Sequence, residues 1–269
     1  MNKSFVLIFL IALLPGGNIV FAQNNKPLYT APLGVQAYTF RNSFPVDIPK
    51  TLDTIKAMGF TEMESTAHGM APEAFKKLCN ERGISIPSSE ASFDQFENAA
   101  DSVAHVAKLL GAKYVMCAWA PHKGAFGIDD AKKAVAVFDK AGKIMKDSGL
   151  IFCYHAHGYE FQPYKDGTLL DYIIKNTNPK YVSFEMDIFW ITFGGANPVA
   201  LMEKYGNRWQ LMHLKDMKKG TVKNLTGGTS VDNDVALGSG EINIPAILKE
   251  AKKIGIRHYF IEDESNFVN

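Results

Sequence analysis

Short apolar runs alternate with longer amphipathic stretches along most of the chain. Eight of the runs are rich in β-branched and aromatic residues, which is typical of buried strands. They cover residues 35–40, 60–65, 84–89, 112–119, 150–157, 181–187, 209–216 and 256–263. Apolar residues at helical spacing predict helices between them, over 48–58, 72–82, 99–110, 129–148 and 244–254.

This alternation predicts parallel strands joined by right-handed crossovers. Eight strands in a chain of this size favour an α/β fold of the closed (β/α)8 TIM barrel type over an open doubly wound sheet. A dinucleotide fold is disfavoured because the first strand leads into Tyr38-Thr39-Phe40 and not into a glycine-rich phosphate loop. The sequence ends at Asn269, soon after the eighth strand, so we expect the eighth helix to be short or absent.

The amino terminus has the pattern of a secretory signal peptide. Lys3 precedes an apolar run over 5–14, and Ala22 supplies a small residue at the cleavage position. The run is far shorter than the roughly 20 residues that a bilayer crossing needs, which argues against a membrane anchor. We therefore expect an exported protein, periplasmic if its source is a Gram-negative bacterium, with no membrane contact after processing. The expected organisation is a signal peptide at 1–22, a polar linker at 23–32 and a barrel at 33–269.

The composition excludes several classes of protein. Of the 269 residues, 46% are apolar and 21% are charged, which is typical of a folded globular domain. The 29 basic and 28 acidic side chains nearly cancel, so net charge gives no support for nucleic-acid binding. Cys79, Cys117 and Cys153 are too few for a disulfide scaffold and lack zinc-ribbon spacing, and we assign them to the core.

Polar residues concentrate in the last four predicted strands, at the ends where TIM barrels place their reacting groups. Period-two alternation directs Asp187 into the lumen from the sixth strand, His213 from the seventh and Glu262 from the eighth. Adjacent strands lie about 4.8 Å apart, so we expect these side chains to converge. Neighbouring carboxylates repel unless a cation neutralises them. A mostly oxygen ligand set predicts one divalent ion, which is Mn, Mg, Co or Zn.

Other polar residues nearby have a structural explanation as well as a functional one. Glu185 also faces the lumen, and we predict that it pairs there with Lys215. His155 and His157, each taken alone, are explained as hydrogen-bonded core histidines. Glu64, at the end of the second strand, is open to both explanations. Agreement across three neighbouring strands is what favours a metal site.

Six motifs follow one another between residues 33 and 263. They are GVQAY at 34–38, YHAHGYEF at 154–161, MDIFW at 186–190, HLKD at 213–216, LGSGEI at 237–242 and IED at 261–263. Together they resemble the xylose isomerase-like sugar phosphate isomerase/epimerase superfamily. The resemblance implies a TIM barrel that holds one divalent ion through Glu160, Asp187, His213 and Glu262.

The chain departs from that superfamily pattern at two positions. Ketose epimerases of the superfamily carry a metal-binding glutamate within strand five, about where this chain has Tyr154. They also carry a histidine three residues after the strand-six aspartate, where this chain has Trp190. Glu160 follows strand five and is the glutamate we carry over. The identity of the general base stays open.

The resemblance implies enolisation of a keto-sugar, which export predicts to be unphosphorylated. The ion stabilises the enediolate that forms when a base removes a carbon-bound proton. Return of a proton to the opposite face of the same carbon gives epimerisation, and return to the other carbon of the enediolate gives isomerisation, so the protein is expected to be a sugar isomerase or epimerase. We assign proton transfer to His157, and next to His155, because histidine titrates near neutral pH. Lys215 is our candidate for stabilising the oxyanion, and Trp119 and Trp190 are candidates for stacking on the sugar.

Three alternative functions stay open. The same enediolate can expel a leaving group, which would make the protein a lyase or dehydratase acting on keto-glycosides. A nuclease on the same barrel, similar to endonuclease IV, is disfavoured because the chain has only seven histidines and a nearly neutral charge. A sugar-binding barrel without turnover is compatible with the irregular fifth strand and the missing eighth helix.

Two further features lie outside the predicted ligand set. The segment 218–240, after the seventh strand, is long and contains glycine and threonine, so it is a candidate lid. A barrel without its eighth helix leaves a gap that a second subunit would cover. A homo-oligomer is therefore a prediction to be tested in solution.

Overall fold

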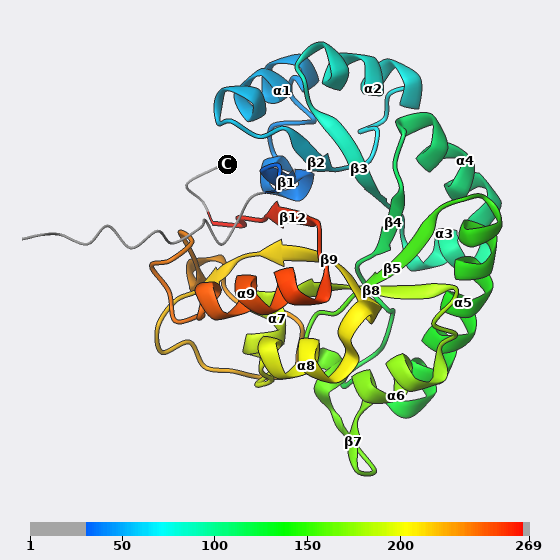
Figure 1. The fold of residues 1–269 in the computed structure, drawn as a ribbon, viewed down its shortest axis with the longest axis vertical. Coiled ribbons are helices and arrows are strands. Elements are labelled where there is room, and N and C mark those ends of the chain that lie inside the picture. Colours follow the sequence, from blue (N-terminus) through cyan, green and yellow to red (C-terminus); the bar gives the residue numbers. More distant parts are fainter. Residues whose placement is uncertain (1–30, 266–269) are drawn as a thin grey trace, which may run out of the picture.

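Eight parallel strands close into a barrel in the computed structural model, which describes residues 31–265 (Figure 1). In chain order they are β1 (Gly34–Gln36), β2 (Glu62–Glu64), β3 (Ser85–Glu90), β4 (Tyr114–Cys117), β5 (Ile151–His155), β8 (Val182–Asp187), β9 (Trp209–Leu214) and β12 (His258–Ile261). β1 closes the barrel by pairing with both β2 and β12. The predicted TIM barrel is confirmed. The predicted signal peptide and most of the predicted linker lie outside the described residues.

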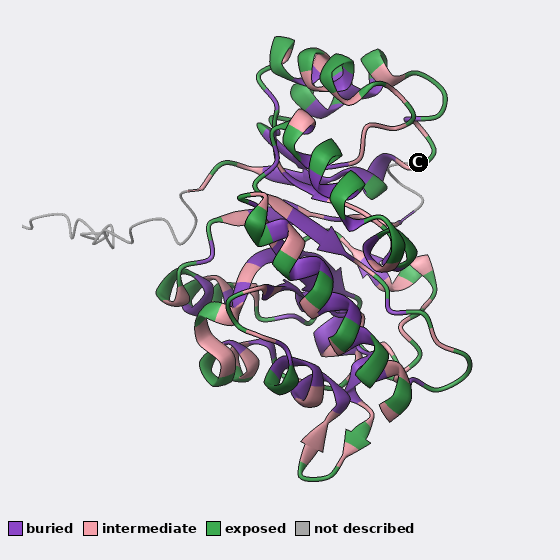
Figure 2. Cartoon of the chain, turned by 90° about the vertical axis from the view of Figure 1, so that its right-hand side faces the viewer, coloured by how far each residue is buried: buried purple, intermediate pink, exposed green. Residues whose placement is uncertain are grey.

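Helices surround the barrel and expose their outer sides, while the strands are largely buried (Figure 2). They are α1 (Ile48–Ala57), α2 (Pro72–Glu81), α3 (Phe93–Asn98), α4 (Ala100–Leu110), α5 (Ile128–Asp147), α6 (Leu169–Asn176), α7 (Ile188–Phe193), α8 (Pro198–Tyr205) and α9 (Ile244–Ile254). The five predicted helices correspond to α1, α2, α4, α5 and α9, each end agreeing to within one residue. Between residues 31 and 265, no helix follows β12, and none is long and apolar enough to cross a membrane.

Apolar side chains fill the amino-terminal half of the lumen, and we call them the apolar layer. Cys153, Leu211 and Phe260 are fully buried there and pack against Tyr114 and Ile151. Their neighbours in the strands face the surrounding helices, as the period of two requires. Such close packing makes the barrel interior a core and not a pore.

β1 is shorter than predicted because the chain turns into a 3₁₀ helix over Ala37–Phe40. The Gln36 side chain accepts a hydrogen bond from the Tyr38 N–H at 3.1 Å and caps this turn. At the start of the strand, a Cβ on Gly34 would lie 2.6 Å from the Tyr259 carbonyl oxygen. Glycine therefore allows β1 to approach β12 closely, and the turn brings Tyr38 to the carboxyl-terminal mouth of the barrel.

The candidate lid, residues 218–240, is fixed at its base. β10 (Asp216–Met217) and β11 (Asp234–Val235) form a short antiparallel pair there. The buried Asp216 carboxylate accepts hydrogen bonds from the backbone N–H groups of Gly238 and Gly240, both at 2.9 Å. The middle of the segment reaches the mouth of the barrel at Gly227. Movement of this segment stays a prediction.

Candidate active site

Ionisable side chains occupy the carboxyl-terminal half of the lumen, and we call them the polar layer. It comprises Glu64 from β2, His155 from β5, Glu185 and Asp187 from β8, His213 from β9 and Glu262, one residue beyond β12. All six side chains are buried. His155, His213 and Glu262 each follow a member of the apolar layer by two residues, so strand alternation turns them into the lumen.

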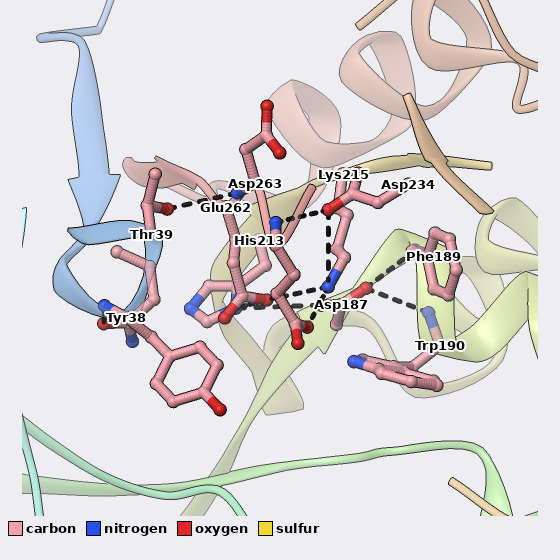
Figure 3. Close-up of polar contacts among 12 residues, drawn as sticks. Tyr38, Thr39, Asp187, Phe189, Trp190, His213, Lys215, Asp234, Glu262 and Asp263 are labelled. Atoms are coloured by element: carbon pink, nitrogen blue, oxygen red, sulfur yellow. Dashed lines mark hydrogen bonds and ion pairs between the residues drawn. The ribbon is translucent and has the colours of Figure 1, made fainter. Parts of the chain in front are cut away.

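The structure brings together Asp187, His213 and Glu262, whose convergence the strand pattern predicts (Figure 3). His213 Nδ1 lies 3.7 Å from Asp187 Oδ2 and 3.6 Å from Glu262 Oε2. These separations are too long for hydrogen bonds. They are close to the ~3.4 Å expected between two atoms that bind one ion at about 2.1 Å in a tetrahedral site. The three strands therefore present ligand atoms at the spacing of a single metal ion.

A hydrogen-bonded carboxylate fixes the orientation of His213. Its Nε2 lies 2.8 Å from Glu64 Oε1, and Glu64 in turn accepts hydrogen bonds from Gln36 Nε2 at 2.8 Å and from the Ser88 hydroxyl. With the proton on Nε2 donated to Glu64, the Nδ1 lone pair of His213 faces Asp187 and Glu262. Carboxylates commonly orient metal-binding histidines in this way. The role of Glu64 was open from the sequence alone. In the structure Glu64 positions His213, a candidate metal ligand.

The start of α7 fixes the orientation of Asp187. Its Oδ1 accepts hydrogen bonds from the backbone N–H groups of Phe189, at 2.7 Å, and Trp190, at 2.9 Å (Figure 3). Asp187 is therefore the N-cap of α7. The other oxygen, Oδ2, is left facing the lumen.

Four buried atoms of the polar layer have no hydrogen-bond partner among the described residues: His155 Nε2, Glu185 Oε1, Asp187 Oδ2 and His213 Nδ1. Leaving such an atom unsatisfied costs about 1–3 kcal/mol. His155 Nε2 lies 3.8 Å from Asp187 Oδ2, so the free atoms of three of these residues face one region. Imidazole nitrogens and carboxylate oxygens are ligands for divalent ions. The residues present therefore fit a metal held by His155, Asp187, His213 and Glu262.

The pKa shifts in the polar layer reveal an excess of negative charge. Burial raises the pKa of Glu185 well above its usual value, and Glu64 adds to the shift. Burial lowers the pKa of His213, but Glu185 and Asp187 outweigh it and raise that pKa well above the usual value. His155 shows the opposite result, because burial and the neighbouring His213 lower its pKa and leave a neutral ring. A bound proton or cation would neutralise the carboxylates of the polar layer and lower their mutual repulsion.

The predicted pairing of Glu185 with Lys215 is wrong. Glu185 Oε2 instead lies 3.2 Å from His155 Nδ1, while Lys215 Nζ lies 3.6 Å from Glu262 Oε2 and forms a short ion pair with Glu264. Lys215 stands one residue beyond β9, so its side chain reaches the acidic groups at the mouth of the barrel. Burial lowers the pKa of Lys215, but Glu262 and Glu264 outweigh it and raise that pKa, which keeps the ammonium charged.

Glu160, the fourth predicted metal ligand, points away from the polar layer. β5 ends at His155, and the chain then turns at Gly158, whose φ is 87°. The Glu160 carboxylate accepts hydrogen bonds from the Tyr154 hydroxyl and, at 3.1 Å, from the His157 N–H. Tyr154 packs on the helix side of β5, so Glu160 is held there as well. Residues 31–265 contain two groups of candidate ligands, and Glu160 belongs to neither: His155 with Glu185 and His213, and Asp187 with His213 and Glu262.

His157, the predicted proton carrier, stands at the mouth of the barrel between two tryptophans. Its ring centroid lies 5.4 Å from that of Trp119, 5.3 Å from that of Trp190 and 4.6 Å from that of His155. Burial lowers the pKa of His157 to about 4, so the ring is neutral at pH 7. Its Nδ1 has no hydrogen-bond partner within the described part of the chain. The expectation that His157 titrates near neutral pH is therefore wrong, although its neutral imidazole is in the form that accepts a proton.

A pocket of about 280 Å³ opens at the polar layer, and we call it the central pocket. Its lining includes Tyr38, Glu90, Trp119, His155, His157, Trp190, Gly227, His213 and Glu262. Tyr38 and Glu90 were not predicted, although Glu90 is an acidic residue directly after a predicted strand. Burial, and repulsion by Glu64 and Glu262, raise the pKa of Glu90 to about 7. Carboxyl, imidazole and aromatic groups thus surround one cavity.

The closed barrel and the ionisable groups at its carboxyl-terminal mouth together define a TIM barrel with a site of the enzymatic type. The chain belongs to the xylose isomerase-like TIM barrel family, which matches residues 52–266. This agrees with the resemblance noted from the sequence motifs.

Named relatives include an inosose dehydratase of Clostridium tetani (strain Massachusetts / E88), 29% identical over 102 residues. That alignment covers 38% of this chain and 33% of the relative, so the chain matches about a third of its length. A sugar phosphate isomerase/epimerase from Parabacteroides distasonis ATCC 8503 has a TM-score of 0.74 at 25% identity, over 89% of this chain and 90% of that one. The IolI protein, solved with a zinc atom, has a TM-score of 0.69 at 15% identity over 88% and 90%, which shows a shared fold.

Proposed function

We propose that the protein is a divalent-metal-dependent enzyme that enolises an unphosphorylated keto-sugar and acts as a sugar isomerase or epimerase. The observation that carries the proposal is the convergence of Asp187, His213 and Glu262 at the central pocket, with buried atoms that lack partners among the described residues. Unpaired buried ionisable groups are costly, and such groups cluster at functional sites. A purely structural core gains nothing from them.

The ion is assigned to His155, Asp187, His213 and Glu262, with His155 in the place first predicted for Glu160. When bound, a divalent ion polarises a substrate carbonyl and stabilises negative charge on its oxygen. Two nitrogen and two oxygen ligands are compatible with Zn, Mn or Co, and Mg is the least suited of the four candidates.

Proton transfer is assigned to His157. Its ring is neutral at pH 7, lies at the central pocket and is 4.6 Å from the His155 ring, centroid to centroid. Lys215 is assigned to the oxyanion, because its charged ammonium lies 3.6 Å from the Glu262 carboxylate. The Lys215 ammonium also lies over the Trp190 ring, 5.3 Å from its centroid, which is favourable for a cation.

A dehydratase is the second candidate. The similarity to the inosose dehydratase of C. tetani favours it. An enediolate whose neighbouring carbon carries a hydroxyl or glycosyloxy group can expel that group, which takes up a proton and leaves as water or as a sugar, and the product is an unsaturated ketone in place of an isomer. Analysis of the products therefore separates the two candidates.

Deuterium exchange tests the proposed function directly. The purified protein is incubated with a panel of keto-sugars in deuterated water, with added Mn or Zn and with a chelator. We expect metal-dependent exchange at a carbon next to the carbonyl, and His157→Ala should slow it at least about a hundredfold. Lack of metal-dependent exchange across the panel would contradict the proposal.

We also propose that the protein is exported and that residues 1–22 are removed. The pattern at the amino terminus supports this. The mass of the protein isolated from its native source is the test, because cleavage after residue 22 gives a product that begins at Gln23. An intact amino terminus would contradict export by this route.

A further inference from the structure

A second pocket, of about 430 Å³, adjoins the central pocket. The two pockets share Glu90, Ala118 and Trp119 in their linings, so they meet at the ends of β3 and β4. The start of α3 forms another side of the second pocket and contributes Asp94 and Gln95. Neither of these two residues lines the central pocket or belongs to the polar layer.

Trp119 is the wall that the two pockets share, and it is the most exposed of the three tryptophans. Its exposed fraction is 40%, against 6% for Trp190 and 1% for Trp209. The Trp119 ring centroid lies 4.6 Å from that of Tyr159, edge to face, and 5.1 Å from that of the stacked His122. An aromatic ring held in this way presents its surface to a ligand at a small cost in conformational entropy.

Two backbone features keep Trp119 in place. The N–H of the next residue, Ala120, donates a hydrogen bond to the Tyr159 hydroxyl at 2.8 Å. Gly227, from the segment 218–240, packs so closely that a Cβ on it would lie 3.3 Å from Trp119 Cζ3 and 2.5 Å from Tyr159 Cδ1. One edge of the indole is therefore covered, and its exposed surface lines the two pockets.

The second pocket also offers hydrogen-bonding groups. Glu90 lines both pockets and makes no side-chain hydrogen bond within residues 31–265. Gln95 Oε1 accepts a hydrogen bond from the Ser92 N–H at 2.9 Å, which leaves the Gln95 amide NH₂ available. A carboxyl group, an amide and an aromatic face suit a ligand that has both hydroxyl groups and apolar C–H faces. A carbohydrate ring has this chemistry.

We propose that the substrate is a keto-sugar that carries a second sugar, and that the second sugar binds in the second pocket against Trp119. The central pocket, at about 280 Å³, is at the small end of the roughly 300–1,000 Å³ that ligand pockets span. It has room for one ring, and an attached ring needs the adjoining space. This proposal rests on the proposed function and names the class of substrate for the same site.

The experiment compares fructose with lactulose, which is fructose carrying a galactosyl group. Calorimetry measures binding, and deuterium exchange measures turnover separately. Asp94→Trp places a large side chain at the second pocket from the exposed first turn of α3. Asp101→Trp is the matched control, because it makes the same change in the exposed first turn of α4 and lines neither pocket. Melting curves of both variants establish that they fold.

We expect the wild-type protein to bind lactulose at least about tenfold more tightly than fructose. Asp94→Trp should lose this preference with its affinity for fructose unchanged, and Asp101→Trp should keep it. Failure to bind lactulose, equal affinity for the two sugars, an unchanged preference in Asp94→Trp, or its loss in Asp101→Trp would each overturn the proposal.

The outcomes also separate this proposal from the proposed function. A preference for lactulose that Asp94→Trp removes, without exchange of either sugar, supports the site for the second sugar and contradicts enolisation. Metal-dependent exchange of fructose without any preference for lactulose supports enolisation and overturns the site for the second sugar.

Discussion

The apolar layer and the polar layer of the lumen use the same strands with opposite energetic consequences. Along β5, β9 and β12, Cys153, Leu211 and Phe260 of the apolar layer each stand two residues before a member of the polar layer. The apolar side chains are fully buried against one another. The polar layer keeps four buried atoms without hydrogen-bond partners in the described chain. Burial of apolar surface stabilises the fold, and unpartnered ionisable groups oppose it.

A step of two residues, about 6.6 Å along a strand, therefore separates a layer that stabilises the fold from the candidate active site. The apolar layer is complete without any ligand. In the polar layer the pKa values of Glu185 and His213 are both raised, by burial of Glu185 and by the carboxylates around His213, and a cation would relieve both shifts. Substitutions in the two layers should consequently affect different measurements.

The largest effect is expected for Asp187→Asn in the polar layer. Asparagine can still cap α7, so the fold should be retained, but the anionic ligand is lost. We expect the deuterium-exchange rate to fall on the order of a thousandfold, which corresponds to the several kcal/mol that a metal ion supplies. The bound metal, measured by elemental analysis, should fall as well. Wild-type exchange and metal content in this variant would contradict the assignment.

Leu211→Ala should have the next largest effect, on stability and not on chemistry. Leu211 is fully buried and packs with Cys153 and Phe260. Removing its side chain leaves a cavity, and we expect the free energy of unfolding to drop by about 2–5 kcal/mol in urea denaturation. Exchange by the folded variant should stay within about tenfold of wild type. A larger loss of activity at unchanged stability would mean that the two layers are not separable.

Glu90→Gln should change the pH dependence of stability by on the order of 2 kcal/mol. Burial, with Glu64 and Glu262 adding to it, raises the pKa of Glu90 from 4.5 to about 7. A carboxyl group with a raised pKa contributes stability that is fully present below the unfolded pKa and is lost as the pH rises through the folded pKa. Urea denaturation in the presence of a chelator should show a smaller decline between pH 5 and pH 7 for Glu90→Gln. The control variant Glu203→Gln, at an exposed position of α8, should decline like wild type.

The smallest effect is expected outside both layers, at Asp171. Its buried carboxylate accepts hydrogen bonds from Lys204 Nζ at 2.7 Å, from the Tyr205 hydroxyl and from the Thr168 N–H at 2.9 Å. Burial raises the pKa of Asp171, but Lys204 and Tyr205 outweigh it and lower that pKa. We expect Asp171→Asn to reduce the free energy of unfolding by about 1 kcal/mol at pH 7, and the difference to shrink as the pH falls through the folded pKa.

The control for Asp171 is Asp129→Asn, which removes an exposed carboxylate from an ion pair with Lys132. Surface pairs contribute little, so its stability should stay within about 0.5 kcal/mol of wild type. Equal effects of the two substitutions would show that a fully satisfied polar group contributes no more than an exposed one.

The direction of the lumen side chains could be predicted because buried strands alternate strictly. Asp187, His213 and Glu262 face inward because each stands an even number of residues from another lumen-facing residue of the same strand. Helices such as α5 and α9 were also predictable, because their apolar spacing is regular and long. The fold and the centre of the site follow from these local patterns.

The remainder of the site depends on contacts between distant segments. The Glu160 side chain is redirected by the turn at Gly158 and by the Tyr154 hydroxyl, which no spacing rule encodes. The ion pair between Lys215 and Glu264 depends on the path that the chain takes after β12. The roles of Glu64 and Glu90 depend on register shifts and loop paths that the sequence pattern does not specify.

The measurement that most directly tests the central claim is anomalous scattering from a crystal grown with Mn or Zn. We predict one ion in the lumen, within about 2.0–2.3 Å of His155 Nε2, Asp187 Oδ2, His213 Nδ1 and a Glu262 oxygen. An empty lumen at saturating metal, or an ion bound without Asp187 and His213, would contradict the account.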